Sequence, residues 1–105
     1  PMAALCISAI TKAELMFGLA KRPQAKRLHK AVHELLRRVD VLAWDGDIAE
    51  LYGAVRADME RQGKILSPLD LLIATHALSV GAVLVTSDKA FGQLSHLRVE
   101  DWSRE

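Results

Sequence analysis

Apolar residues recur along the chain in two patterns, short continuous runs and helical repeats. Short runs rich in apolar residues lie at 4–10, 39–44 and 82–86, and such runs are typical of buried strands. Elsewhere, apolar positions recur every three or four residues, which predicts amphipathic helices. We expect these helices at about 11–20, 24–38, 48–62, 68–80 and 88–94, with a last short strand at 97–100.

Cap and turn residues support these boundaries. Thr11 followed by Glu14, and Ser67 followed by Asp70, have the spacing found at helix N-termini. Pro68 suits the first position of a helix, and a glycine such as Gly81 commonly ends one. The helix between them is apolar nearly all round, which predicts burial on several sides.

The predicted order is strand, two helices, strand, two helices, strand, helix, strand. Such alternation favours an α/β fold, a three-layer α/β/α sandwich with a mainly parallel sheet. We find no linker, repeat or low-complexity segment, so residues 1–105 are interpreted as a single domain. In folds of this class, the functional crevice lies beyond the carboxyl ends of the strands.

Three acids fall at places that suit such a crevice. Glu14 and Asp88 follow strand ends, and Asp70 is near the start of the buried helix. Converging carboxylates need a cation, and Mg²⁺ or Mn²⁺ prefers oxygen ligands. Such a site activates water and neutralises charge during phosphodiester cleavage. Each acid has an alternative role, because helix N-termini often carry acids as caps or to complement the helix dipole.

Composition narrows the class of protein. The 105 residues carry a formal net charge of +1, so the chain as a whole is not a basic nucleic-acid coat. The single cysteine, Cys6, cannot form an internal disulfide and is interpreted as a small buried apolar residue. We find no leader peptide and no apolar run long enough to span a membrane, so a cytoplasmic protein is expected.

Two weaker signals lie on or just before the helix at 24–38, and a third lies on the buried helix. His29 and His33 have a spacing that can bind zinc, although a solvated helix face is the favoured interpretation. A concentration of basic residues suggests either contacts to RNA phosphates or another solvated face; its members are Lys21, Arg22, Lys26, Arg27, Lys30, Arg37 and Arg38. His76 is expected to be a hydrogen-bonded core histidine.

Three segments in order resemble PIN-domain ribonucleases of the VapC toxin type. They are ISAITKAELMFGL at 7–19, GKILSPLDLLIATHAL at 63–78 and AVLVTSDKAFGQLSHLRVEDW at 82–102. The resemblance implies a metal-dependent endoribonuclease toxin that cleaves RNA, with tRNA as one candidate substrate, and is paired with a VapB-like antitoxin. It also implies a homodimer.

By matching position, the resemblance assigns Glu14, Asp70 and Asp88 as catalytic residues that hold Mg²⁺ or Mn²⁺. It also assigns Thr86 as a polar residue beside the metal; an ordinary strand-end threonine is the alternative.

One part of the family pattern is missing from the sequence. Family members begin with a strand carrying Leu-Asp-Thr-Asn, and no Asp occurs here before position 40. The expectation is a PIN-like fold incomplete at its N-terminus, without the first strand and helix. The alternative function is a catalytically dead remnant that keeps only dimerisation or antitoxin-binding surfaces. An unrelated α/β binding module is disfavoured, because no phosphate-binding glycine loop is present.

Overall fold

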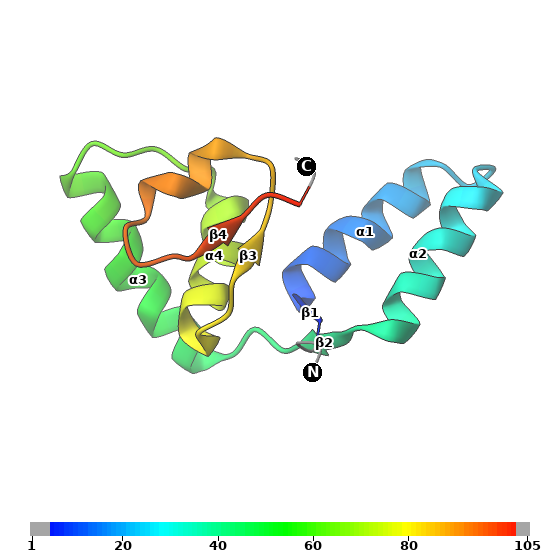
Figure 1. Ribbon diagram of the computed structural model, residues 1–105, viewed down its shortest axis with the longest axis horizontal. Coiled ribbons are helices and arrows are strands. Elements are labelled where there is room, and N and C mark those ends of the chain that lie inside the picture. The colour runs from blue at the N-terminus through cyan, green and yellow to red at the C-terminus, as the bar shows by residue number, and fades with distance from the viewer. Residues whose placement is uncertain (1–4, 103–105) are drawn as a thin grey trace. The chain divides into compact units, whose positions relative to one another are not determined.

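The computed structural model describes residues 5–102, and the chain divides into two compact units. The N-terminal unit comprises Pro1–Trp44 and the C-terminal unit Asp45–Glu105 (Figure 1). Within residues 5–102, no helix combines the length and the apolar character that a membrane span requires.

The N-terminal unit is a pair of helices flanked by two short strands. Its elements are β1 (Cys6–Ser8), α1 (Ala9–Lys21), α2 (Lys26–Arg38) and β2 (Asp40–Leu42). The strands β1 and β2 pair in parallel, with Cys6 opposite Asp40. Leu19 of α1 and Val32 of α2 are its buried helix side chains. The two helices therefore form the crossover between parallel strands that the sequence predicts.

The start of α1 differs from the prediction. The helix begins at Ala9, because Ser8 caps it: the Ile10 N–H donates to Ser8 Oγ at 3.1 Å. The expected strand to residue 10 and the expected start at Thr11 are therefore wrong, while Ala4 lies outside the described residues. Cys6 is exposed rather than buried. Within the described residues, β1 is hydrogen-bonded to β2 alone.

The C-terminal unit packs two helices against a strand pair and a short 3₁₀ helix. Its elements are α3 (Gly46–Arg61), α4 (Pro68–Val80), β3 (Leu84–Val85), η1 (Lys89–Gln93) and β4 (Val99–Glu100). β3 and β4 are parallel, with Leu84 opposite Val99. Helices α3 and α4 pack together, as Figure 1 shows. The core of this unit consists of Met59, Leu71, Ala74, Ala77, Phe91, Leu94 and Leu97.

Most of the predicted elements are present within two residues or so of their expected ends. The α/β class with parallel strands is confirmed, since each unit contributes one parallel pair. The predicted burial of α4 is also confirmed: it buries Leu71, Ala74, Thr75, His76 and Ala77. Amphipathic and cap patterns therefore locate the helices approximately, although the cap of α1 is Ser8 and not Thr11.

Two glycines allow a test of the backbone at the end of α4. Gly81 has a φ of 66°, whereas Gly53 lies inside α3, and a Cβ would have open space at both sites. Gly81→Ala should therefore destabilise the protein by about 1–2 kcal/mol through the left-handed conformation alone. Gly53→Ala should stabilise it by up to about 1 kcal/mol. Urea unfolding measures both, and two changes of the same sign would contradict this account.

Candidate active site

Asp70 lies in the first turn of α4. Ser67 caps this helix by accepting a hydrogen bond from the Asp70 N–H at 3.2 Å, and Pro68 occupies the first position. The predicted helix start is therefore confirmed. Asp70 is half-buried, and within residues 5–102 its carboxylate makes no hydrogen bond or ion pair.

Asp88 and Thr86 form a small turn at the end of β3. The Asp88 N–H donates to Thr86 Oγ1 at 3.1 Å, and the Ala90 N–H donates to Asp88 Oδ1 at 2.9 Å. Asp88 is thus the N-cap of η1, as one of the two interpretations predicted. The cap occupies Oδ1, and the second carboxylate oxygen is left for another ligand. The Thr86 hydroxyl therefore fixes the backbone of Asp88, a contact beyond that of an ordinary strand-end threonine.

Glu14 lies on α1 and is exposed. Because α1 begins at Ala9, Glu14 is in the second turn, and the first turn contains no acid. The capping role that was its alternative is therefore excluded by the position of the helix start. Glu14 belongs to the N-terminal unit, whereas Asp70 and Asp88 belong to the C-terminal unit.

The donor set suits a hard divalent cation. Glu14, Asp70 and Asp88 offer only carboxylate oxygens, the ligands that Mg²⁺ and Mn²⁺ prefer. Mg²⁺ needs just one or two protein carboxylates when water and substrate phosphate complete its shell. Among residues 5–102, neither unit contains three His, Cys, Asp or Glu side chains grouped closely enough to hold a metal. The three carboxylates fit the ion by donor type alone, and their assignment as metal ligands stays a prediction.

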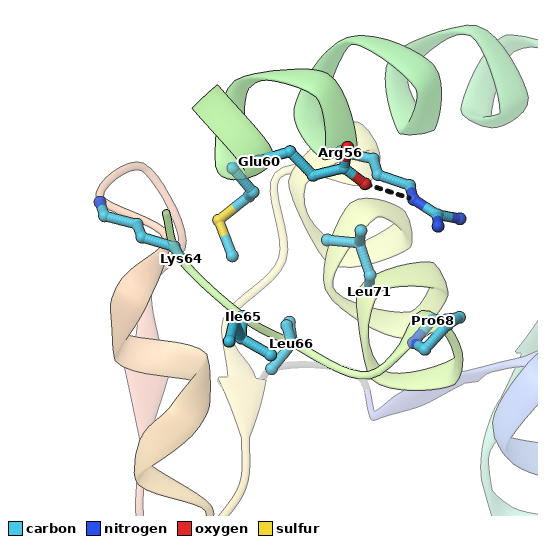
Figure 2. Close-up of a pocket in the computed structure, with 8 residues that line it drawn as sticks. Arg56, Glu60, Lys64, Ile65, Leu66, Pro68 and Leu71 are labelled. Carbon is cyan, nitrogen blue, oxygen red and sulfur yellow. Dashed lines mark hydrogen bonds and ion pairs between the residues drawn. The ribbon is translucent and has the colours of Figure 1, made fainter. Parts of the chain in front are cut away.

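One hollow of the C-terminal unit lies between residues of α3, the segment 64–66 and the start of α4. It has a volume of about 240 Å³ and is lined by Arg56, Met59, Glu60, Lys64, Ile65, Leu66, Pro68 and Leu71. Figure 2 shows the Arg56–Glu60 ion pair on α3 at its rim, with an Nε–Oε2 distance of 3.2 Å. None of the three acids lines this hollow. The hollow is therefore not formed by the candidate acids.

Gln93 is a structural residue that no sequence pattern indicates. Its Oε1 accepts from the Ile65 N–H at 3.2 Å, and its Nε2 donates to the Ile65 carbonyl at 2.7 Å. Nε2 also donates to the Ala90 carbonyl at 2.9 Å. These bonds tie the segment before α4 to η1, the two elements next to Asp70 and Asp88. Ile65 is 28 residues away, so no local pattern indicates the contact.

His76 is a core residue, as predicted. His76 is 3% exposed, and burial lowers its pKa while the charge of Asp45 partly opposes this shift. It is therefore a neutral core residue at pH 7. His29 Nε2 hydrogen-bonds the Arg22 carbonyl at 2.8 Å, and the described residues provide no third ligand beside His29 and His33.

Known proteins resemble the chain over nearly all of its length. The PIN domain family matches residues 2–97. A protein of Shigella flexneri named tRNA(fMet)-specific endonuclease VapC is 38% identical over 100 residues, covering 94% of this chain and 76% of the relative. Ribonuclease VapC2 of Haemophilus influenzae is 33% identical over 99 residues, covering 93% and 75%.

A solved structure supports the same relationship. The crystal structure of VapBC2 from Rickettsia felis, bound to a DNA fragment from its promoter, matches with a TM-score of 0.87 and 31% identity. The match covers 94% of this chain and 75% of that one. Fold, sequence and order of motifs therefore agree, and the chain belongs to the PIN-domain family, among its VapC members.

Proposed function

We propose that this protein is a metal-dependent endoribonuclease, the toxin of a VapBC-type toxin–antitoxin module. The observation that carries the proposal is the similarity to VapC ribonucleases over 94% of the chain, at up to 38% identity. In the structure both candidate acids of the C-terminal unit, Asp70 and Asp88, lie at helix starts. A preceding hydroxyl, Ser67 Oγ or Thr86 Oγ1, accepts a hydrogen bond from the backbone N–H of each acid. By analogy with the relatives, a structured RNA such as tRNA is the proposed substrate.

Glu14, Asp70 and Asp88 are the residues that we propose to hold Mg²⁺ or Mn²⁺. The ion would supply charge neutralisation at the scissile phosphate and a more acidic water. The Ser67 hydroxyl caps α4 and holds the backbone of Asp70 by accepting its N–H. The Thr86 hydroxyl holds the backbone of Asp88 in the same way. Gln93 then limits movement between the segments on which these two acids lie. A site assembled in this way would orient phosphate without reorganising during the reaction.

We also propose a VapB-like antitoxin as partner, because the matching crystal structure is a VapBC complex. A homodimer is part of the same proposal and rests on the family resemblance. The cytoplasm is the proposed compartment, since an RNA substrate is found there and the exposed, unpaired Cys6 suits a reducing environment.

Removal and return of the metal tests the proposed chemistry. The chain should cleave a structured RNA in Mn²⁺, lose this activity in excess EDTA, and regain it when Mn²⁺ is added beyond the chelator. Denaturing gel electrophoresis of labelled RNA measures the products, and Ca²⁺ serves as a matched divalent control for non-specific folding of the RNA. Cleavage that persists in EDTA would rule out the metal-dependent mechanism. RNA that stays intact in Mn²⁺ would favour the inactive remnant.

A further inference from the structure

The two units carry formal net charges of opposite sign, although the charge of the whole chain is nearly neutral. Residues 1–44 contain eight Lys or Arg and three Asp or Glu, a formal net charge of +5. Residues 45–105 contain six and ten, a net charge of −4. Seven of the eight basic residues lie within 21–38, where Glu34 is the only acid. A local basic surface is therefore present although the whole chain is not basic.

Helix α2 arranges part of this charge in a stripe. Lys26, Lys30 and Arg37 are separated by four and seven residues, so they share one face of the helix. The stripe is about 16 Å long at 1.5 Å of rise per residue. Arg27 lies beside it, and all four side chains are exposed. We call these four residues the basic face of α2. The opposite face carries Leu28, Val32, Leu35 and Leu36, and Val32 is buried.

The basic face is only partly neutralised by the protein itself. Glu34 pairs with Arg37 at 3.1 Å and with Arg38 at 3.9 Å. In the described part of the chain, no ion pair involves Lys26, Arg27 or Lys30. These cations also occupy the first turns of α2, where positive charge opposes the helix dipole and no acid is present. Helix stability therefore does not explain their placement.

The spacing of these charges suits a phosphate backbone better than a protein surface. Phosphate contacts come from exposed Lys and Arg and need no pocket. Protein interfaces, in contrast, usually surround an apolar centre with a polar rim, and the basic face has no apolar side chain within its stripe. An acidic polypeptide is the competing occupant, and it is one outcome of the test below.

We propose that the basic face of α2 binds the phosphate backbone of RNA and positions the strand independently of its sequence. The inference rests on the proposed function, because the RNA held here is the substrate that the acids would cut. In this proposal α2 provides affinity for the RNA, and the three candidate acids provide its cleavage. Loss of the basic face should therefore weaken binding similarly for RNAs of different sequence.

Two double variants with equal charge changes test this assignment in the intact chain. Lys26→Gln/Lys30→Gln removes two cations of α2, and Arg56→Gln/Arg61→Gln removes two from α3. Fluorescence anisotropy with a labelled RNA hairpin, in EDTA and over a range of KCl concentrations, gives the dissociation constant and its salt dependence. The α2 variant should bind about tenfold more weakly, and the slope of log K against log salt should become shallower by about 1.5–2. The α3 variant should stay within about twofold of the unmodified chain, because its cations are assigned no phosphate contact.

Equal losses in the two variants would overturn the proposal, since they would reflect net charge alone. Unchanged RNA affinity in the α2 variant would also overturn it, even if that variant no longer bound polyglutamate, the probe for an acidic polypeptide. The same hairpin incubated with the unmodified chain in Mn²⁺ reports the proposed function separately. Intact RNA there would contradict the nuclease, whereas a weaker Kd for the α2 variant alone would still support the RNA-binding face.

Discussion

Asp70→Asn is expected to lower the rate of RNA cleavage by at least about 100-fold, because a metal-holding carboxylate supports several kcal/mol of transition-state stabilisation. The amide has the same shape as the carboxylate, so the cap by Ser67 should persist, since it uses the Asp70 N–H. The loss of a favourable charge near the start of α4 should cost stability by only about 0.3–1 kcal/mol. Initial rates in Mn²⁺ and urea unfolding together separate the two effects.

Asp47→Asn is the matched control. Asp47 lies in the first turn of α3, as Asp70 does in α4, and has been given no role in the site. Its replacement should change stability about as much as that of Asp70 but leave the cleavage rate within about twofold, because only the dipole contribution is lost. If the two variants lose activity equally, Asp70 acts through helix stability and not through a metal.

Leu71→Ala is expected to destabilise the protein by about 2–5 kcal/mol, since it leaves a cavity among packed side chains. Leu71 is 3% exposed and belongs to the core of the C-terminal unit, together with Met59 and Phe91. A loss of this size is a large fraction of the roughly 5–15 kcal/mol by which domains are usually stable. Urea unfolding followed by far-UV circular dichroism measures the change.

Leu69→Ala provides the comparison on the same turn of the same helix. Leu69 is 39% exposed, so its truncation removes fewer contacts and should cost less than about 1 kcal/mol. Both variants make the same chemical change, which isolates the effect of burial. Similar losses for Leu69→Ala and Leu71→Ala would mean that α4 does not face the core as described.

Local features could be predicted from the sequence where a cap or a glycine determines them. Ser67 with Pro68 defines the start of α4, and Gly81 with its positive φ ends it. The start of α1 was harder, because Ser8 and Thr11 are both plausible caps and the residues around them are apolar in either a strand or a helix. Ser8 is the cap, which moves Glu14 from the first turn to the second.

Features that depend on distant residues could not be predicted. Gln93 binds the backbone of Ile65 across 28 positions, and hydrophobic periodicity contains no signal for such a contact. The burial of Cys6 was also predicted wrongly, because burial of a strand depends on its neighbours and not on its own composition. The candidate acids were selected by residue type and resemblance, and their local settings at Ser67 and Thr86 emerge only from the structure.

The most direct test of the central claim, that the protein is an endoribonuclease, uses a circular RNA. Such an RNA has no ends, so only internal cleavage can open it. In Mn²⁺ the chain should first convert the circle into a full-length linear product, which denaturing electrophoresis separates from the circle, and then into shorter fragments. Two results would contradict the account. In one, the circle stays closed while a linear RNA of the same sequence is shortened from its ends. In the other, both the circle and the linear RNA stay intact.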